Sequence, residues 1–383
     1  MFNTSVIELN RTALKNNVEF IRNYLREDCR FSSVIKGNAY GHGIPVYVPL
    51  AEECGVEHFS VFSAGEAWQA QKVARRKPSF LIMGGTDRQE MEWAVEQGID
   101  FFVSDPGSLQ DAVESAGRVG EKARIHLELE TGMNRTGFEP RELKKAIPLI
   151  NKSLDLLTLA GVCTHFAGAE SIANYHRIQH QKKAFRRLVK WLLQEDLVPE
   201  NYHTACSAAA LRYPETQMDM VRIGILQYGF LPTREILIDY MVKKKTNENP
   251  VQRILTWKSR VTGTKRISKG SFVGYGTSFL ATNDMMVAAI PVGYAQGFSR
   301  SMSNRGHVLI RGERAAVVGM VNMNMMLVDV SHIEGVEKGD ETILIGKQGD
   351  REITVASFGE ISEQVNYELL TRLPECIPRI ITD

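Results

Sequence analysis

The first 240 residues alternate between short apolar segments and longer amphipathic ones, and this alternation constrains the fold more than any other feature. Segments of strand length recur eight times, at residues 31–35, 59–62, 80–83, 101–103, 125–129, 159–164, 202–205 and 221–225. Segments of helix length lie between most of them. The clearest is 174–193, where Ile178, Phe185 and Leu192 share one face. A repeated strand–helix order predicts either a (β/α)8 barrel or a doubly wound parallel sheet.

Polar residues at the strand ends distinguish these two architectures. Five of them stand at or just after the carboxyl end of a predicted strand: Lys36, Arg135, His165, Ser207 and Arg222. Barrel enzymes build their active sites at this edge of the sheet. We therefore predict an α/β fold of the (β/α)8 barrel type, with a site at the carboxyl ends of its strands.

The pattern changes after a polar stretch at residues 246–250, which contains the breakers Asn249 and Pro250. Short β-type runs separated by glycines follow, at 257–261, 287–292, 307–310, 315–321 and 342–345. This pattern predicts an all-β second domain. We expect the barrel to span 10–240 and the β domain 250–383, with a strand in residues 1–9 joining the β domain. A helix at 355–371 and a strand at 376–381 are expected to end the chain.

Charge and hydropathy argue against two classes of partner. The net charge is +1, from 46 basic and 45 acidic residues, which provides no field for nucleic acid or an anionic membrane. The longest apolar run, 285–292, is too short to span a bilayer, and the N-terminus does not resemble a signal peptide. We expect neither nucleic acid nor membrane as a partner.

The cysteines and histidines suggest neither a disulfide framework nor a metal site. Five cysteines are scattered without a C-x-x-C pair, which predicts reduced thiols and a cytoplasmic location. His176 and His180 have the spacing of a helical metal pair, but no third ligand lies near them in the sequence. We interpret them as part of a solvated helix face and expect no metal.

Residues 34–43 read VIKGNAYGHG and place Lys36 at a strand end before a tight polar turn. A lysine at such a position is usually a solvated surface residue. Here the turn also contains the phenol of Tyr40, and a turn of this kind suits a phosphate bound beside an amine that must lose its proton to act.

These residues resemble the corresponding motif of the alanine racemases, which are fold-type III pyridoxal phosphate enzymes. The resemblance runs from about residue 5 to residue 380. It implies that Lys36 forms a Schiff base with pyridoxal 5′-phosphate and that Tyr40 binds the phosphate. Gly37 stands where the family more often has alanine, which is also small.

Further cofactor contacts are implied by two later segments, HTACSAAAL and VRIGILQYG. Ser207 and the backbone amides of Gly224 and Ile225 match phosphate contacts of the family, and Arg222 matches the arginine that hydrogen-bonds the pyridine nitrogen. Because a guanidinium does not readily give up its proton, that nitrogen stays unprotonated. Cys206 replaces an asparagine that is common in the family.

The segment GMNRTGF contains Arg135, which matches the family arginine that holds the substrate carboxylate. An arginine fork suits a carboxylate because two parallel donors meet two oxygens. Glu128 stands where the family often has a carbamylated lysine, and it supplies a carboxylate without that modification. His165 follows an apolar strand, where a lone histidine is more often a core residue. The resemblance instead implies that His165 lies beside a catalytic tyrosine, which acts as the second base of the reaction.

That second base is implied by VGYAQGFSR, which contains Tyr294. From the residues alone, Tyr294 could be a simple cap on an apolar strand. The unperturbed phenol pKa near ~10 is too high for base catalysis at neutral pH, so His165 and Arg222 are expected to lower it. The backbone of Met323 is implied to contact the substrate carboxylate. Asn324 and Glu375 depart from the family's aspartate and tyrosine, and Glu375 is expected to point away from the phosphate.

The resemblance therefore implies a two-base amino-acid racemase, with conversion of L-alanine to D-alanine as the first expectation. It also implies a homodimer in which each site receives Tyr294 from the other subunit. A racemase for serine or another amino acid, and a non-catalytic pyridoxal phosphate-binding protein, remain alternatives.

Overall fold

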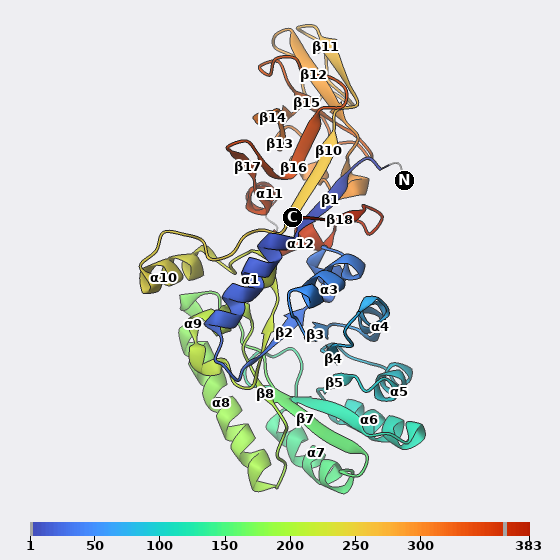
Figure 1. Cartoon of the computed structure of the whole chain (residues 1–383), viewed down its shortest axis with the longest axis vertical. Helices are drawn as coiled ribbons and strands as arrows, with labels where there is room; N and C mark the ends of the chain where they lie inside the picture. The colour runs from blue at the N-terminus through green and yellow to red at the C-terminus, as the bar shows by residue number, and fades with distance from the viewer. Residues whose placement is uncertain (1–2, 363–365) are drawn as a thin grey trace. The chain divides into compact units, whose positions relative to one another are not determined.

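The computed structural model describes residues 3–362 and 366–383 (Figure 1). The described chain forms two compact units. The first, called the barrel unit below, consists of Thr12–Lys36 and Tyr47–Arg253. The second, called the β unit, contains the remaining described residues, including the short segment Gly37–Val46. Lys36 and the turn that follows it thus belong to different units.

The barrel unit is built on a sheet of eight parallel strands whose order follows the chain. Its strands are β2 (Arg30–Val34), β3 (His58–Val61), β4 (Ser79–Ile82), β5 (Asp100–Val103), β6 (Ala123–Glu128), β7 (Leu157–Cys163), β8 (Tyr202–His203) and β9 (Met220–Ile223). β9 pairs with β2, and a parallel bridge between Cys206 and Arg222 joins its other edge to the segment after β8. A doubly wound sheet reverses its order at a switch point. This sheet nearly closes on itself instead, which confirms the predicted barrel.

Helices follow most of the strands, and α4 to α7 lie outside the sheet in Figure 1. The helices are α1 (Arg11–Tyr24), α3 (Ile44–Glu53), α4 (Ala64–Val73), α5 (Arg88–Glu96), α6 (Pro106–Val119), α7 (Pro140–Lys152), α8 (Tyr175–Gln194), α9 (Ser207–Arg212) and α10 (Arg234–Lys244). Side chains cap the N-termini of several of these helices. The carboxylates of Asp87 and Asp105, for example, accept hydrogen bonds from the first-turn amides of α5 and α6. The predicted helix at 174–193 is α8, and it buries Ile178, Phe185 and Leu192.

The β unit contains a sheet in the order β11-β12-β15-β14-β13-β16-β10-β1-β18, to which β17 adds through β16. Its strands are β1 (Val6–Asn10), β10 (Leu255–Arg260), β11 (Gly263–Ile267), β12 (Met285–Ile290), β13 (His307–Ile310), β14 (Glu313–Val317), β15 (Met326–Asp329), β16 (Glu341–Gln348), β17 (Arg351–Ile353) and β18 (Arg379–Thr382). β1 pairs antiparallel with β10 and parallel with β18, so the N-terminal strand lies in this sheet.

One sequence expectation for this unit needs correction. The strand expected at 315–321 ends at Val317, because Gly319 has a φ of 76° that interrupts extended backbone. Within the helix expected at 355–371, the described segments α11 (Val355–Ser362) and α12 (Asn366–Thr371) are helical. Part of that expected helix, 363–365, lies outside the described residues, as do residues 1–2 of the expected N-terminal strand. No helix in the described part of the chain is long and apolar enough to cross a membrane.

Candidate active site

The turn after β2 has an unusual backbone. The segment α2 (Lys36–Tyr40) turns with the opposite hand to an ordinary helix: Gly37, Asn38, Ala39 and Tyr40 have φ of 62°, 54°, 54° and 51°. This conformation costs roughly 1–2 kcal/mol for each residue that carries a Cβ. Hydrogen bonds compensate, since the amide of Gly41 donates to the Gly37 carbonyl at 2.9 Å and the amide of Gly43 donates to the Asn38 carbonyl at 2.9 Å. Such strain is concentrated at functional sites.

Lys36 is exposed in the isolated chain, yet its ammonium group is disfavoured. Desolvation by the surrounding barrel atoms, followed by the positive charge of Arg135, lowers its pKa, and Arg222 adds to the effect. Glu66 opposes the shift. A lowered pKa increases the neutral amine fraction at a given pH, and the neutral amine is the nucleophile.

Arg222 extends from β9 into the barrel and is 5% exposed. Its Nη1 donates to the His203 carbonyl oxygen at 3.1 Å and also contacts Nδ1 of the His203 ring, while its Nη2 donates to the Thr164 carbonyl oxygen at 2.8 Å. These contacts use three of the five N–H groups of a guanidinium. Within the described ranges, Nε–H and the second N–H of Nη2 have no partner. These two N–H groups are therefore available to an acceptor on a bound group.

His165 lies directly after the Thr164 carbonyl that Arg222 binds, and it is half-buried. Burial, together with the charges of Arg222, Arg135 and Lys36, lowers the pKa of its imidazole to about 3. The ring is therefore neutral at physiological pH. Its carbonyl oxygen accepts a hydrogen bond of 2.9 Å from Nε2 of Gln181 on α8, which fixes the loop in place.

Ser207, Gly224 and Ile225 come together where α9 and the turn η3 (Ile225–Tyr228) begin. The Ser207 hydroxyl oxygen accepts a hydrogen bond of 3.0 Å from the amide of Gly224. That hydroxyl keeps its own hydrogen to donate, and the amide of Ile225 stands at the start of a helical turn. Donors that converge at helix starts form an anion site.

Glu128 and Arg135 differ in their exposure to solvent. Glu128 is buried at the end of β6, whereas Arg135 is exposed in the loop that follows. Neither a hydrogen bond nor an ion pair joins their side chains within residues 3–362 and 366–383. The loop is instead organised by Glu130, whose carboxylate accepts hydrogen bonds from the amides of Gly132 and Asn134. Orientation of Arg135 by Glu128 therefore stays a prediction.

In the β unit, the main chains of Tyr294 and Met323 are held together. The amide of Tyr294 donates to the Asn322 carbonyl at 3.1 Å, and the amide of Ala295 donates to the Met323 carbonyl at 2.9 Å. This approach requires Gly293, because a Cβ there would lie 2.0 Å from the Asn322 oxygen. The side chains of Tyr294 and Met323 are 42% and 56% exposed. Glu375 is exposed in the same unit, as is Asn324.

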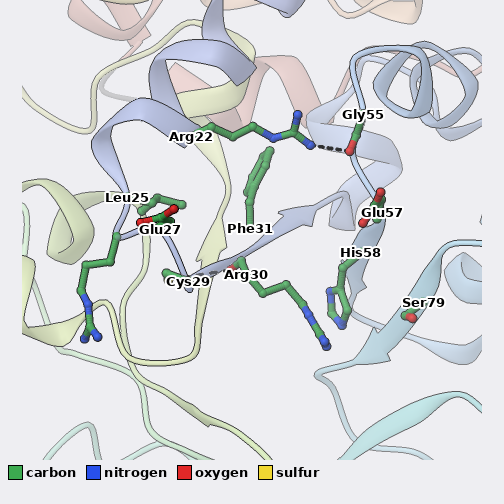
Figure 2. Close-up of a pocket in the computed structure, with 11 residues that line it drawn as sticks. Arg22, Leu25, Glu27, Cys29, Arg30, Phe31, Gly55, Glu57, His58 and Ser79 are labelled. Atoms are coloured by element: carbon green, nitrogen blue, oxygen red, sulfur yellow. Dashed lines mark hydrogen bonds between the residues drawn. The ribbon is translucent and has the colours of Figure 1, made fainter.

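One cavity of the barrel unit lies away from these residues. It has a volume of about 390 Å³ and opens at the amino ends of β2, β3 and β4, where Arg22, Arg30, His58 and Ser79 line it (Figure 2). The predicted site residues of the barrel unit come from the opposite, carboxyl ends of the strands. Because barrel active sites lie at the carboxyl ends, we do not assign the chemistry to this cavity.

Sequence reasoning missed the residues beneath Arg222. His203 opens the segment that contains Ser207 and contacts Arg222, and its ring nitrogen Nε2 lies 2.7 Å from Nδ1 of His126. One signal was available: His126 precedes Glu128 by two residues on the same strand, so both side chains lie on the same face of the sheet.

Comparisons with known proteins show the family and the fold of this chain. Residues 9–232 match the family model "Alanine racemase, N-terminal domain", and residues 254–381 match "Alanine racemase, C-terminal domain". The alanine racemase of Leptospira interrogans serogroup Icterohaemorrhagiae is 32% identical over 99% of this chain and 96% of that protein. The crystal structure of alanine racemase from D-cycloserine-producing Streptomyces lavendulae superimposes with a TM-score of 0.91 at 27% identity, covering 100% of this chain and 98% of the other. The Bartonella henselae enzyme, solved with covalently bound pyridoxal phosphate, shares the fold with a TM-score of 0.85 at 23% identity, over 100% of both chains.

Proposed function

Because this chain belongs to the alanine racemase family, we propose that it interconverts L- and D-alanine with pyridoxal 5′-phosphate held at Lys36. The single observation that carries the proposal is that Lys36 and Arg222 belong to paired strands, Lys36 just after β2 and Arg222 in β9. Desolvation, then the charge of Arg135 and to a smaller extent that of Arg222, lower the pKa of the lysine amine, and two N–H donors of Arg222 have no partner among the described residues. A neutral amine could bind the cofactor covalently, and an available N–H donor could bind the nitrogen of its ring.

The donor set fits the cofactor at three points. Lys36 would hold it covalently, Arg222 would donate to its ring nitrogen, and Ser207 with the amide of Ile225 would bind its phosphate. Tyr40 and the amide of Gly224 are further proposed phosphate contacts, although the Gly224 amide donates to Ser207 here. When bound, the cofactor withdraws electrons from the α-carbon and so makes its proton easier to remove.

The chain's own residues would then move that proton. Inversion at the α-carbon requires an acid and a base on opposite faces, and we assign these roles to the Lys36 amine and the Tyr294 phenol. His165 is neutral, because burial and nearby cations lower its pKa to about 3, so its imidazole can hydrogen-bond a phenol without adding charge. Arg222 can only donate to the nitrogen of the cofactor ring, which would moderate the electron withdrawal that the ring supplies when bound.

Arg135 is the proposed ligand of the substrate carboxylate, together with the backbone of Met323. The exposed position of Arg135 leaves its donors available to a small ligand. Glu128 is proposed to act on the same site through its negative charge. The small-molecule substrate is therefore an amino acid, with alanine proposed on the strength of the family.

The proposal extends to assembly and location. We propose a homodimer in which each site receives Tyr294 from the partner chain, and the 42% exposure of that side chain is consistent with a role outside its own unit. The five cysteines are free thiols, which supports a reducing, cytoplasmic compartment.

Optical activity tests the function directly. Purified protein loaded with pyridoxal phosphate is mixed with pure L-alanine and, in parallel, with L-serine, and rotation is followed to equilibrium. We expect the alanine signal to decay to zero, and faster than the serine signal. Faster decay of the serine signal would identify serine as the preferred substrate in place of alanine. A constant signal for both amino acids would indicate a non-catalytic cofactor-binding protein.

A further inference from the structure

A continuous line of hydrogen bonds, buried except at its Asp100 end, starts at Arg222 and crosses the barrel interior. Nδ1 of His203 contacts Nη1 of Arg222, and Nε2 of His203 lies 2.7 Å from Nδ1 of His126. Nε2 of His126 lies 2.9 Å from Oδ2 of Asp100. The four residues come from β9, β8, β6 and β5, so the line passes from strand to strand across the sheet.

The two ends of this line determine where its protons lie. Arg222 can only donate, so Nδ1 of His203 must accept, and the proton of His203 must sit on Nε2. The proton on Nε2 of His203 requires an acceptor, so Nδ1 of His126 must carry an unprotonated lone pair. The proton of His126 then sits on its Nε2. The last proton points at Asp100, which as a carboxylate can only accept. Both imidazoles are thus neutral, in one tautomer.

Asp100 is itself held in place as an anion. Its second oxygen, Oδ1, accepts a hydrogen bond of 2.7 Å from Nε of Arg124, whose guanidinium also pairs with Glu200 at 2.7 Å. Burial opposes ionisation of Asp100, but the hydrogen bonds from His126 and Arg124, together with the charge of Arg124, outweigh it and lower the pKa of the carboxyl group.

The residues packed around the rings of His126 and His203 leave room for both rings in this arrangement. A Cβ at Gly161 on β7 would lie 2.2 Å from Nδ1 and 2.6 Å from Cε1 of His126, so only glycine leaves room for the ring. The register between β6 and β7 shifts at this point, and His126 then stands opposite Gly161. The ring of Phe102 lies 6.3 Å from the His126 ring, 6.0 Å from the His203 ring and 6.0 Å from the Arg222 guanidinium.

We propose that Asp100 and His126 are positioning residues that keep Nδ1 of His203 an acceptor, and that this holds the free N–H edge of Arg222 ready for the cofactor ring. The role of Arg222 toward the cofactor rests on the proposed function, whereas the proton arrangement does not. If the tautomer of His203 reverses, a donor on the ring faces a donor on Arg222. The guanidinium then loses a hydrogen bond and its orientation.

The decisive variant is Asp100→Asn, which removes the acceptor-only end of the line. The asparagine cannot offer an oxygen to both Arg124 and His126, and its NH2 group toward His126 favours the opposite tautomer. Glu200→Gln is the matched control, because it neutralises the carboxylate at the far side of Arg124 and leaves Asp100 unchanged. Gly161→Ala is a second route, since it displaces the His126 ring without changing any hydrogen-bonding side chain.

The first measurement requires neither cofactor nor activity. Two-bond nitrogen–proton correlations of apoprotein labelled with ¹⁵N-histidine distinguish the two tautomers, and His203→Gln and His126→Gln assign the signals. We expect Nε2–H for both histidines in the wild type and in Glu200→Gln. Asp100→Asn and Gly161→Ala should show loss of this single tautomer at His203. A wild-type His203 that is protonated on Nδ1, or charged, would overturn the inference even if every variant failed to fold.

The second measurement is the dissociation constant for pyridoxal 5′-phosphate, followed by absorbance. Loss of one hydrogen bond to a buried cation predicts affinity about 10- to 100-fold weaker in Asp100→Asn and Gly161→Ala, with no change in Glu200→Gln. Unchanged affinity in both variants despite a reversed tautomer would refute the link to the cofactor. If the wild type shows the expected tautomers but binds no pyridoxal phosphate, the proposed function fails and the proton arrangement stands.

Discussion

The predicted site residues of the two units differ in what holds them in place. In the barrel unit, Arg222 is 5% exposed and its guanidinium is bound to the barrel wall through His203 and Thr164. In the β unit, Tyr294 is 42% exposed, and among the described residues its hydrogen bonds are made by the main chain. The barrel unit thus positions its groups by itself. A phenol that must act as a base needs a further surface around it, which the proposed homodimer would supply.

The largest expected effect concerns the barrel side of this comparison. Lys36→Ala should reduce racemisation by about 10⁴-fold or more, because the chain loses both the cofactor linkage and one proton-transfer group. Borohydride treatment of the wild type should fix the cofactor to Lys36, as read by peptide mapping. Mapping of the reduced adduct to another lysine would remove Lys36 from the site.

The second prediction tests whether the exposed Tyr294 serves another chain. Tyr294→Phe alone should lower kcat by about 10²- to 10⁴-fold, whereas Tyr275→Phe, which changes a more exposed tyrosine of the same unit, should not. Mixing Lys36→Ala chains with Tyr294→Phe chains should restore about a quarter of wild-type activity, since random pairing makes half the dimers hybrids with one intact site. Hybrids that form but show no activity would mean that both groups come from one chain.

A smaller effect follows from the buried histidines of the barrel unit. Burial lowers the pKa of His58 and His165 to about 3 and that of His203 well below its usual value. Between about pH 6.5 and 3 the unfolded chain therefore binds more protons than the folded chain. Their contribution to stability is present above this range and is lost as the pH falls, by up to about 1.4 kcal/mol per pH unit for each histidine.

Urea denaturation at pH 7, 6 and 5 measures this dependence on pH. Replacement of the buried histidine in His58→Gln should flatten the slope by about one proton. The exposed control His176→Gln should leave the slope unchanged. Equal slopes for all three proteins would show that His58 is not held neutral in the folded barrel.

The smallest effect is expected at Glu128. Because a glutamate already carries a negative charge, depletion of bicarbonate should leave activity unchanged. Glu128→Gln should raise KM for alanine by the equivalent of about 1–3 kcal/mol at most, with little change in kcat, since the structure shows Glu128 buried and Arg135 exposed without a direct contact. A fully active variant would end the orienting role assigned to Glu128.

The sequence by itself determined the barrel and the identity of most candidate site residues. Strands buried on both faces are continuous apolar runs, and their spacing with helices reveals a parallel sheet without any knowledge of long-range contacts. Lys36 and His165 could be found because each follows such a run directly, whereas Arg135 lies in the loop after one and Arg222 lies within one. The local sequence pattern was sufficient to find these residues, since an apolar run shows where a strand lies and where it ends.

Only the tertiary structure decided how those residues are held. The left-handed turn at 37–40 contains two residues, Ala39 and Tyr40, for which local preference opposes that conformation, so its surroundings must impose it. Asp100, His126 and His203 lie 26 and 77 residues apart along the chain and meet because their strands are neighbours or near neighbours in the barrel. From the sequence alone, a histidine in an apolar strand is interpreted as a buried core residue. Its hydrogen-bond partners, and therefore its proton, depend on strand register, which is set by packing of the whole sheet.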